Sequence, residues 1–260
     1  MPITGVKPFE MPLRLIDNIA MGHHLQSVAV SRDGTQLYVG LVDENCISIV
    51  DLATGGIAGR IDLPGSPTDV QVSPNGSTAL VTALERAVSG ERGKAYVIDL
   101  RTNELTADFP AGFNPQTAVF SPQGTFAYIC DFSDDAALTP GGGTVLALRT
   151  VDWLLTATIP TGDHTFSAAT SPDGNFVYAS TTFAGGSLAI VDTNIQEVVG
   201  FVTDLRGAFG DRGESGRHTG LRVGAGQCDR VHRRCGQRSV DRVNRRRHRA
   251  ACPRNQSRSP

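Results

Sequence analysis

Ser31-Arg32-Asp33-Gly34 is the first of four similar tetrapeptides that decide the fold of this 260-residue chain. The other three keep Ser first and Gly last, and they follow at spacings of 42, 48 and 50 residues: Ser73-Pro74-Asn75-Gly76, Ser121-Pro122-Gln123-Gly124 and Ser171-Pro172-Asp173-Gly174. Ser at the first position, Pro at the second and Gly at the fourth suit a type I turn. We therefore predict four tight polar turns at nearly regular intervals.

Each turn lies between two short apolar runs, which is the pattern of a β-hairpin. The preceding runs are Ser27–Val30, Asp69–Val72, Thr117–Phe120 and Ser167–Thr170, and the following runs are Gln36–Gly40, Thr78–Thr82, Phe126–Cys130 and Phe176–Ser180. A third and a fourth run complete every unit, as Ile47–Asp51 and Ala58–Leu63 do in the first. Four short strands in each repeat, without a convincing amphipathic helix, predict an all-β fold of four propeller blades over residues 13–205.

The second strand of each unit carries a recurring tetrapeptide. The four copies are Tyr38-Val39-Gly40-Leu41, Leu80-Val81-Thr82-Ala83, Tyr128-Ile129-Cys130-Asp131 and Tyr178-Ala179-Ser180-Thr181. Together with the segment Ile49–Gly55, they resemble the YVTN-type β-propeller repeat family, although no unit keeps the final Asn. The resemblance implies a ring of about seven blades, of which this chain would carry four. Because such propellers serve as surface proteins and binding modules, and similar ones as lactonases and lyases, it implies an architecture and no single activity.

Two insertions lengthen the middle units. They are residues 85–93 and 133–143, and both are polar or rich in glycine. We expect them to be loops that rise side by side from one face of the propeller, where loops usually confer specificity.

The chain has two parts of opposite charge. Residues 1–205 carry 9 Lys and Arg against 22 Asp and Glu, a net charge of −13, whereas residues 206–260 carry 15 Arg, no Lys and 4 Asp and Glu, a net charge of +11. The basic part has one Phe and no Ile, Met, Trp or Tyr. Because it cannot bury enough apolar area to offset its ordering entropy, we predict a disordered tail.

Three origins of this tail stay open. A frameshift in GC-rich coding DNA would give such an excess of Arg, and we favour this origin, which makes the chain a truncated gene product. A genuine basic arm would bind nucleic acid, but such arms usually mix Lys with Arg. A zinc site is the third, but Cys228 and Cys235 lack the close spacing of structural zinc ligands. Its candidate ligands are Cys228, His232, Cys235, His248 and Cys252.

Other sequence features bound the location of the chain. Residues 1–22 contain no continuous apolar run like that of a secretory signal. No stretch approaches the ~20 apolar residues of a membrane span. We expect a cytoplasmic protein as the sequence stands, or an extracytoplasmic one if its N-terminus is incomplete. Cys46 and Cys130 lie in separate repeats, so we predict small buried side chains and not ligands.

The residues just before the first strand of each unit should meet around the propeller axis. Counting seven and five residues back from each turn Ser gives two rows: His24, Ser66, Asn114 and His164, and Gln26, Thr68, Gln116 and Phe166. Asp131 ends a second strand beside an insertion and should lie close by. We predict that His24, Gln26, Asn114, Gln116, Asp131 and His164 form a ligand-binding channel mouth.

Two interpretations of this mouth compete. His24, His164 and Asp131 could ligate a metal or transfer protons. We favour the second interpretation, a hydrated mouth whose polar groups bind one another and water. The recurring Asp51, Asp99 and Asp192 suggest catalysis, but each ends a strand and should bind turn amides.

These features lead to two functional hypotheses. The first is a non-catalytic scaffold that binds a protein or a small ligand through one face, without a cofactor. The alternative is a lactonase- or lyase-like enzyme with a divalent cation in its channel. In both cases four blades cannot close a ring of seven, and we expect self-association through the unclosed edges.

Overall fold

The structure is a computed structural model that describes residues 18–22, 24–87, 90–132, 142–162, 164–181 and 186–203. Several predictions fall outside these residues and stay predictions. They concern the disorder, origin and possible zinc or nucleic-acid binding of residues 206–260, and the loop at residues 133–141.

Within these described residues, sixteen strands form four antiparallel sheets, one for each predicted blade. Blade 1 contains β1 (Leu25–Val30), β2 (Gln36–Leu41), β3 (Cys46–Asp51) and β4 (Ile57–Asp62). Blade 2 contains β5 (Ser66–Val72), β6 (Thr78–Ala87), β7 (Gly90–Asp99) and β8 (Glu104–Pro110). Blade 3 contains β9 (Pro115–Phe120), β10 (Phe126–Phe132), β11 (Gly143–Arg149) and β12 (Leu154–Gly162). Blade 4 contains β13 (Thr165–Thr170), β14 (Phe176–Thr181), β15 (Ser187–Asp192) and β16 (Glu197–Val202).

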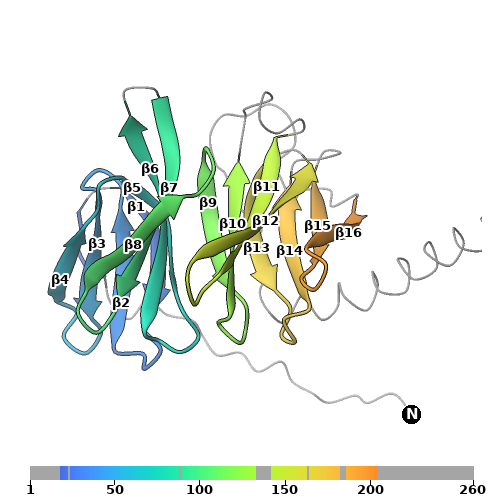
Figure 1. Ribbon diagram of the computed structural model, residues 1–260. Coiled ribbons are helices and arrows are strands. Elements are labelled where there is room, and N and C mark those ends of the chain that lie inside the picture. Colours follow the sequence, from blue (N-terminus) through green and yellow to red (C-terminus); the bar gives the residue numbers. More distant parts are fainter. Residues whose placement is uncertain are drawn as a thin grey trace, which may run out of the picture.

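The four sheets stand side by side in chain order (Figure 1). Their first strands lie innermost, because β5 packs against both β1 and β9, and β9 packs against β13. The described residues therefore form an all-β arc of four propeller blades, as the repeat spacing predicts. None of the described residues forms a helix long and apolar enough to cross a lipid bilayer.

The predicted turns join the first two strands of each blade. In blade 1 the Gly34 amide donates to the Ser31 carbonyl at 2.9 Å, and the Gln36 amide donates to Ser31 Oγ at 2.9 Å. Gly34 has a φ of 73°. The glycines at the fourth position of the other three turns have φ values between 71° and 78°. The left-handed backbone at this position favours glycine over any residue with a side chain.

Every blade has two apolar faces, because successive side chains of a strand alternate. We call the side that meets the next blade along the chain the forward face and the opposite side the backward face. On the forward face of blade 1, Tyr38 and Ile49 pack against Val70 and Val81 on the backward face of blade 2. The same arrangement recurs between blades 2 and 3 and between blades 3 and 4. Burial between neighbouring sheets therefore supplies the core.

The first insertion is not a loop, contrary to the prediction. Residues 85–87 and 90–93 extend β6 and β7 into a long hairpin, with Glu85 opposite Arg92 and Ala87 opposite Gly90. Figure 1 shows this hairpin reaching beyond the neighbouring strands. Polar and glycine residues favour a loop, but the backbone ladder of a hairpin can continue through such residues.

Trp153 packs between blades 2 and 3. Its ring lies 6.0 Å from that of Phe109 and 6.4 Å from that of Phe120. Its φ is 55°, and Gly55 and Asn103 occupy the same position in blades 1 and 2 with similar φ values. Packing between blades 2 and 3 therefore holds a bulky residue in a conformation that usually favours Gly or Asn. Since the sequence contains one Trp, its fluorescence reports on this interface.

Candidate functional site

The inner strands all begin at the same end of the blades, which we call the mouth. His24, Asn114 and His164 immediately precede β1, β9 and β13, and Ser66 is the first residue of β5. Each following inner strand pairs antiparallel with the second strand of its own blade, so the four residues occupy equivalent places. The sequence count thus selected structurally equivalent positions, and the interactions of these residues differ from blade to blade.

A pocket of about 370 Å³ lies at the mouth between blades 1 and 2. Its polar lining includes Asp43, Asn45 and Ser66, and the Ser66 hydroxyl donates to Asn45 Oδ1 at 2.6 Å. His24 stands at the edge of this group, with its Nδ1 3.2 Å from Asp43 Oδ1. The two side chains are 63% and 57% exposed, so water has free access to the pair.

The positions of the lining residues explain why sequence reasoning missed this pocket. Asp43 and Asn45 belong to the turn between β2 and β3, and Pro64 and Gly65 belong to the connection between blades 1 and 2. Asn45 has a φ of 49°, a left-handed conformation that Asn tolerates. The Asn at the end of Val42–Asn45 is typical of a turn, but the sequence does not show that this turn meets the next blade.

The Asp131 carboxylate accepts hydrogen bonds from backbone amides. Its side chain is buried, the residue being 3% exposed. Oδ1 accepts hydrogen bonds from the Asn114 amide at 2.7 Å and from the Phe113 amide at 3.1 Å. Burial raises the pKa of the Asp131 carboxyl, and the hydrogen bonds from these two amides oppose the rise. The carboxylate thus fixes the connection between β8 and β9.

The neighbouring predicted residues form part of the same local network. Gln116 Nε2 donates to Asn114 Oδ1 at 2.6 Å, and the Phe132 amide donates to the Asn114 carbonyl at 2.9 Å. Asn114, Gln116 and Asp131 therefore come together, as expected for the mouth. Gln26, at the other end of the arc, is exposed.

His164 lies in an aromatic cluster. Its ring stacks on Phe132 with a centroid distance of 4.2 Å and an interplanar angle of 19°. The Phe132 ring also lies 4.6 Å from that of Phe166. All three side chains are half-buried. Sequence reasoning singled out His164 but overlooked Phe132, which follows Asp131 directly at the end of β10.

The structure does not bring together His24, His164 and Asp131, the trio of the alternative metal or proton-transfer interpretation. His24 pairs with Asp43, His164 stacks on Phe132, and Asp131 binds backbone amides. Within the described ranges, no three His, Cys, Asp or Glu side chains lie close enough together to hold a metal ion.

The recurring strand-end aspartates have the structural role that their position suggests. Asp51 Oδ1 accepts from the amides of Ala53 at 2.9 Å and Thr54 at 2.8 Å, and these bonds hold the pKa of Asp51 below its usual value. Asp99 and Asp192 accept hydrogen bonds from equivalent turn amides. Cys46 and Cys130 are free and fully buried, and burial raises the pKa of the Cys130 thiol to about 12.

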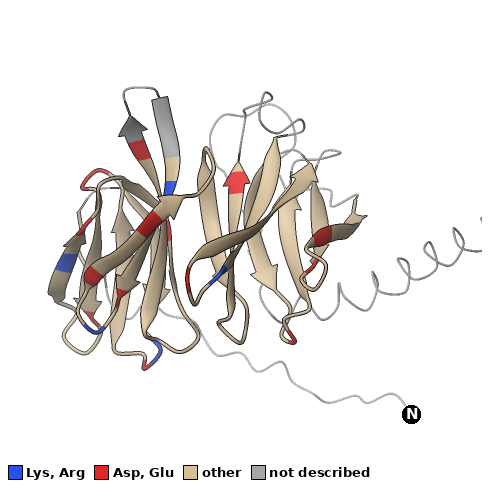
Figure 2. Cartoon of the chain, viewed as in Figure 1, with Lys and Arg blue, Asp and Glu red and all other residues tan. Residues whose placement is uncertain are grey.

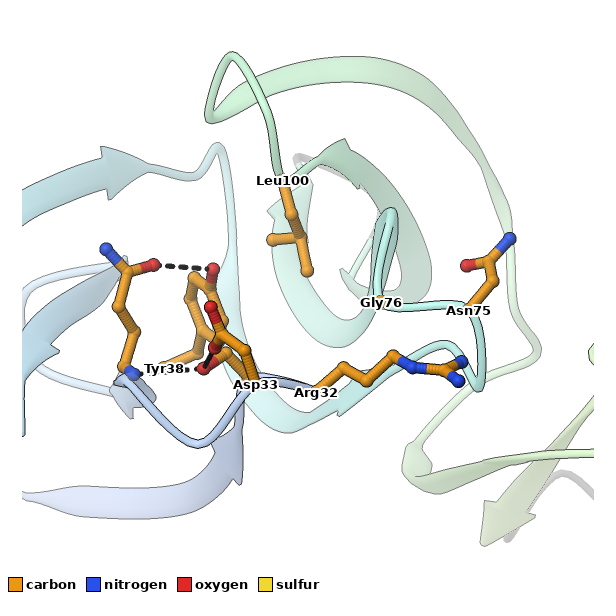
Figure 3. Close-up of a pocket in the computed structure, with 8 residues that line it drawn as sticks. Arg32, Asp33, Tyr38, Asn75, Gly76 and Leu100 are labelled. Atoms are coloured by element: carbon orange, nitrogen blue, oxygen red, sulfur yellow. Dashed lines mark hydrogen bonds between the residues drawn. The ribbon is translucent and has the colours of Figure 1, made fainter.

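A second pocket, of about 380 Å³, lies at the opposite end of the same two blades (Figure 3). Its Asp33 carboxylate accepts from Ser31 Oγ at 2.6 Å and from Thr35 Oγ1 at 2.8 Å, which lowers its pKa. Figure 3 shows the Arg32 side chain extending toward the turn of blade 2, where its guanidinium donates to the Pro74 carbonyl. The charged groups here tie turns together, so we favour the mouth as the ligand site.

Acidic groups outnumber basic ones over the described blades, as Figure 2 shows. At the mouth, Asp43 is more than half exposed, whereas Glu44 forms an ion pair with Arg60 at 2.5 Å. Glu85, at the base of the long hairpin, accepts a hydrogen bond from the Tyr96 hydroxyl. Asp43 therefore offers the mouth an accessible carboxylate.

The chain is similar to the seven-bladed β-propeller protein Rv1057 of Mycobacterium tuberculosis. The two are 26% identical over 141 residues, which is 52% of this chain and 34% of Rv1057. The chain thus spans about a third of that relative. No protein-family model matches it.

Solved structures share the fold at low sequence identity. They include Kuenenia stuttgartiensis hydrazine synthase (TM-score 0.59, 19% identity, 68% of this chain and 48% of the other). The Cps50 (Swd1) β-propeller domain of Myceliophteria thermophila has a TM-score of 0.58 at 18% identity, over 71% of this chain and 56% of the other. A functionally unknown protein from Desulfotomaculum acetoxidans has a TM-score of 0.58 at 17% identity, over 71% and 57% of the two chains. These likenesses support a β-propeller, and membership of the YVTN-type family stays a prediction.

Proposed function

We propose that the four blades belong to a non-catalytic scaffold that binds a small polar ligand at the mouth between blades 1 and 2. The observation that carries this proposal is the pocket of about 370 Å³, which falls within the usual size range of ligand sites. Asp43, Asn45 and Ser66 supply hydrogen-bonding groups that converge on it. A neutral or cationic ligand suits the accessible Asp43 carboxylate.

The state of the possible catalytic groups supports a scaffold over an enzyme. Asp131 has a buried carboxylate with a raised pKa at the mouth. Its oxygens already accept hydrogen bonds from the backbone amides of Phe113 and Asn114. The His24–Asp43 pair is open to solvent and lacks the water-excluding surroundings that strengthen electrostatic catalysis. Such exposed groups are better suited to recognition.

The test is a ligand-observed NMR screen of small amines and neutral sugars against the full chain. We expect Asp43→Asn to weaken the binding of any hit about tenfold, because a charge-assisted hydrogen bond is lost. Asp152→Asn is the matched control, since this exposed carboxylate lies in the turn between β11 and β12. Hits that bind both variants equally well would contradict the proposed site. A stoichiometric divalent cation in the purified protein would favour the lactonase- or lyase-like alternative.

A further inference from the structure

The inner strand of blade 1 has an exposed apolar flank. The same flank of the inner strand is buried in blades 2 and 3. Val28 and Val30 on the backward face of β1 are 51% and 53% exposed. The equivalent of Val28 is Val70 in blade 2 and Ala118 in blade 3, and these are 0% and 1% exposed. The preceding blade buries Val70, so the exposure of Val28 marks the place of a missing neighbour.

The turns show the same vacancy independently. A Cβ atom built on Gly76 would lie 2.7 Å from Cβ of Arg32, and one built on Gly124 would lie 3.4 Å from Pro74. Each turn glycine thus receives a side chain from the turn of the preceding blade. Gly34 has the same backbone conformation, but nothing lies within 4 Å of its Cβ position.

This open flank is confined to the inner strand and its turn. Farther out on the same face of blade 1, Val39, Leu41 and Val50 are buried, and Ile19 and Met21 pack against them. A docking partner therefore has to supply an inner strand and a turn, and not a whole blade face.

The forward side of blade 4 offers a matching element. Tyr178 and Ile190 stand where Tyr38 and Ile49 stand in blade 1, so its forward face follows the same pattern. Tyr178 and Ile190 are already buried, to 1% and 7% exposure. The inner strand β13 and its turn lie beside this face, and Pro172 and Asp173 of the turn are exposed.

We propose that a second copy of this chain docks on the open flank, with its β13 and Pro172–Asp173 turn against β1 and Gly34. This contact repeats the junctions between the inner strands β1 and β5, β5 and β9, and β9 and β13. The four described blades have one flank of each kind, so a two-fold axis along the channel uses both flanks and closes a ring of eight blades. Neither strand carries a charged residue, so the contact between the two strands buries no ionised side chain. The proposal is independent of the ligand.

Sedimentation velocity of the full chain and of the Val28→Lys/Val30→Lys variant tests the docking. We expect the wild type to sediment as a dimer of 27.6 kDa chains and the variant as a monomer. Both residues are exposed in the single chain, so Trp153 fluorescence should show that the variant remains folded. Ile57→Lys is the control, because Ile57 is 64% exposed on the outer strand of the same blade. A monomeric wild type, or a dimer that survives Val28→Lys/Val30→Lys, would overturn the proposal.

Disulfide trapping tests the orientation. In a background with Cys228, Cys235 and Cys252 replaced by Ser, we expect Gly34→Cys/Pro172→Cys to form a dimer linked at both junctions. The internal equivalent of this pair, Gly76 and Arg32, is close enough for a disulfide after small adjustments. Gly34→Cys/Asn194→Cys, with the second thiol in an outer turn of blade 4, should not cross-link. Links between two copies of position 34, or open chains longer than a dimer, would contradict the head-to-tail ring.

Discussion

Asp131→Ala is expected to lower the free energy of unfolding by about 3 kcal/mol. The substitution leaves the half-buried amides of Phe113 and Asn114 without their acceptor. It also removes the group that holds the connection between β8 and β9. Urea denaturation followed by Trp153 fluorescence measures the loss.

Asp131→Asn provides the matched control, because its amide oxygen can still accept from the same donors. We expect it to lose less than half as much stability as Asp131→Ala. Equal losses in the two variants would show that the backbone acceptor is not the reason for the effect. A negligible loss in Asp131→Ala would contradict the structural role altogether and return Asp131 to the candidate ligand-binding residues.

The difference in stability between the wild type and Asp131→Asn should depend on pH, because the pKa of Asp131 is raised in the folded state. The folded state holds the proton to a higher pH than the unfolded state, whose pKa stays near 3.8. Between the two pKa values the native state binds more protons, so stability falls as pH rises through that window. We expect the stability of the wild type relative to Asp131→Asn to decline from pH 3.8 upward until the folded pKa is passed. A relative stability that rises over this range would contradict a raised pKa.

Leu80→Ala is also expected to cost about 3 kcal/mol of unfolding free energy. Leu80 is 0% exposed and packs on the forward face of blade 2 against Ala127 and Ile129 of blade 3. The truncation removes buried apolar area and leaves a cavity between two sheets. Neither sheet can move on its own to fill this cavity. Trp153 borders the same cluster, so its fluorescence should follow the transition.

Leu105→Ala is the control for this prediction, since Leu105 belongs to the same blade but is 40% exposed. We expect it to change the unfolding free energy by about 0.5 kcal/mol. Similar losses for Leu80→Ala and Leu105→Ala would mean that the interface between blades 2 and 3 contributes no more than the surface. The difference between them therefore measures the packing between blades.

The sequence alone determined the blades, because local chemistry specifies them. The Ser-Pro-Asp-Gly turns fix where each hairpin reverses, and the alternation of side chains fixes two apolar faces per sheet. The same local logic placed Asp51 on its turn amides and aligned His24 with His164. These features need only residues that are close along the chain.

Contacts between distant segments decided the candidate site. His24 meets Asp43, 19 residues away, and Asp131 reaches Asn114, 17 residues away. Connections of irregular length bring these partners together, so counting from the turns could place the row but not assign its interactions.

Exposure of the blade faces also depended on the tertiary structure. Val28 and Val70 are the same amino acid at the same position of the repeat, but one is 51% exposed and the other 0%. Repeat chemistry makes both apolar, whereas only the presence of a preceding blade buries the side chain. The sequence pattern thus specified the faces of each blade, and the order of the blades in space decided which face remains open.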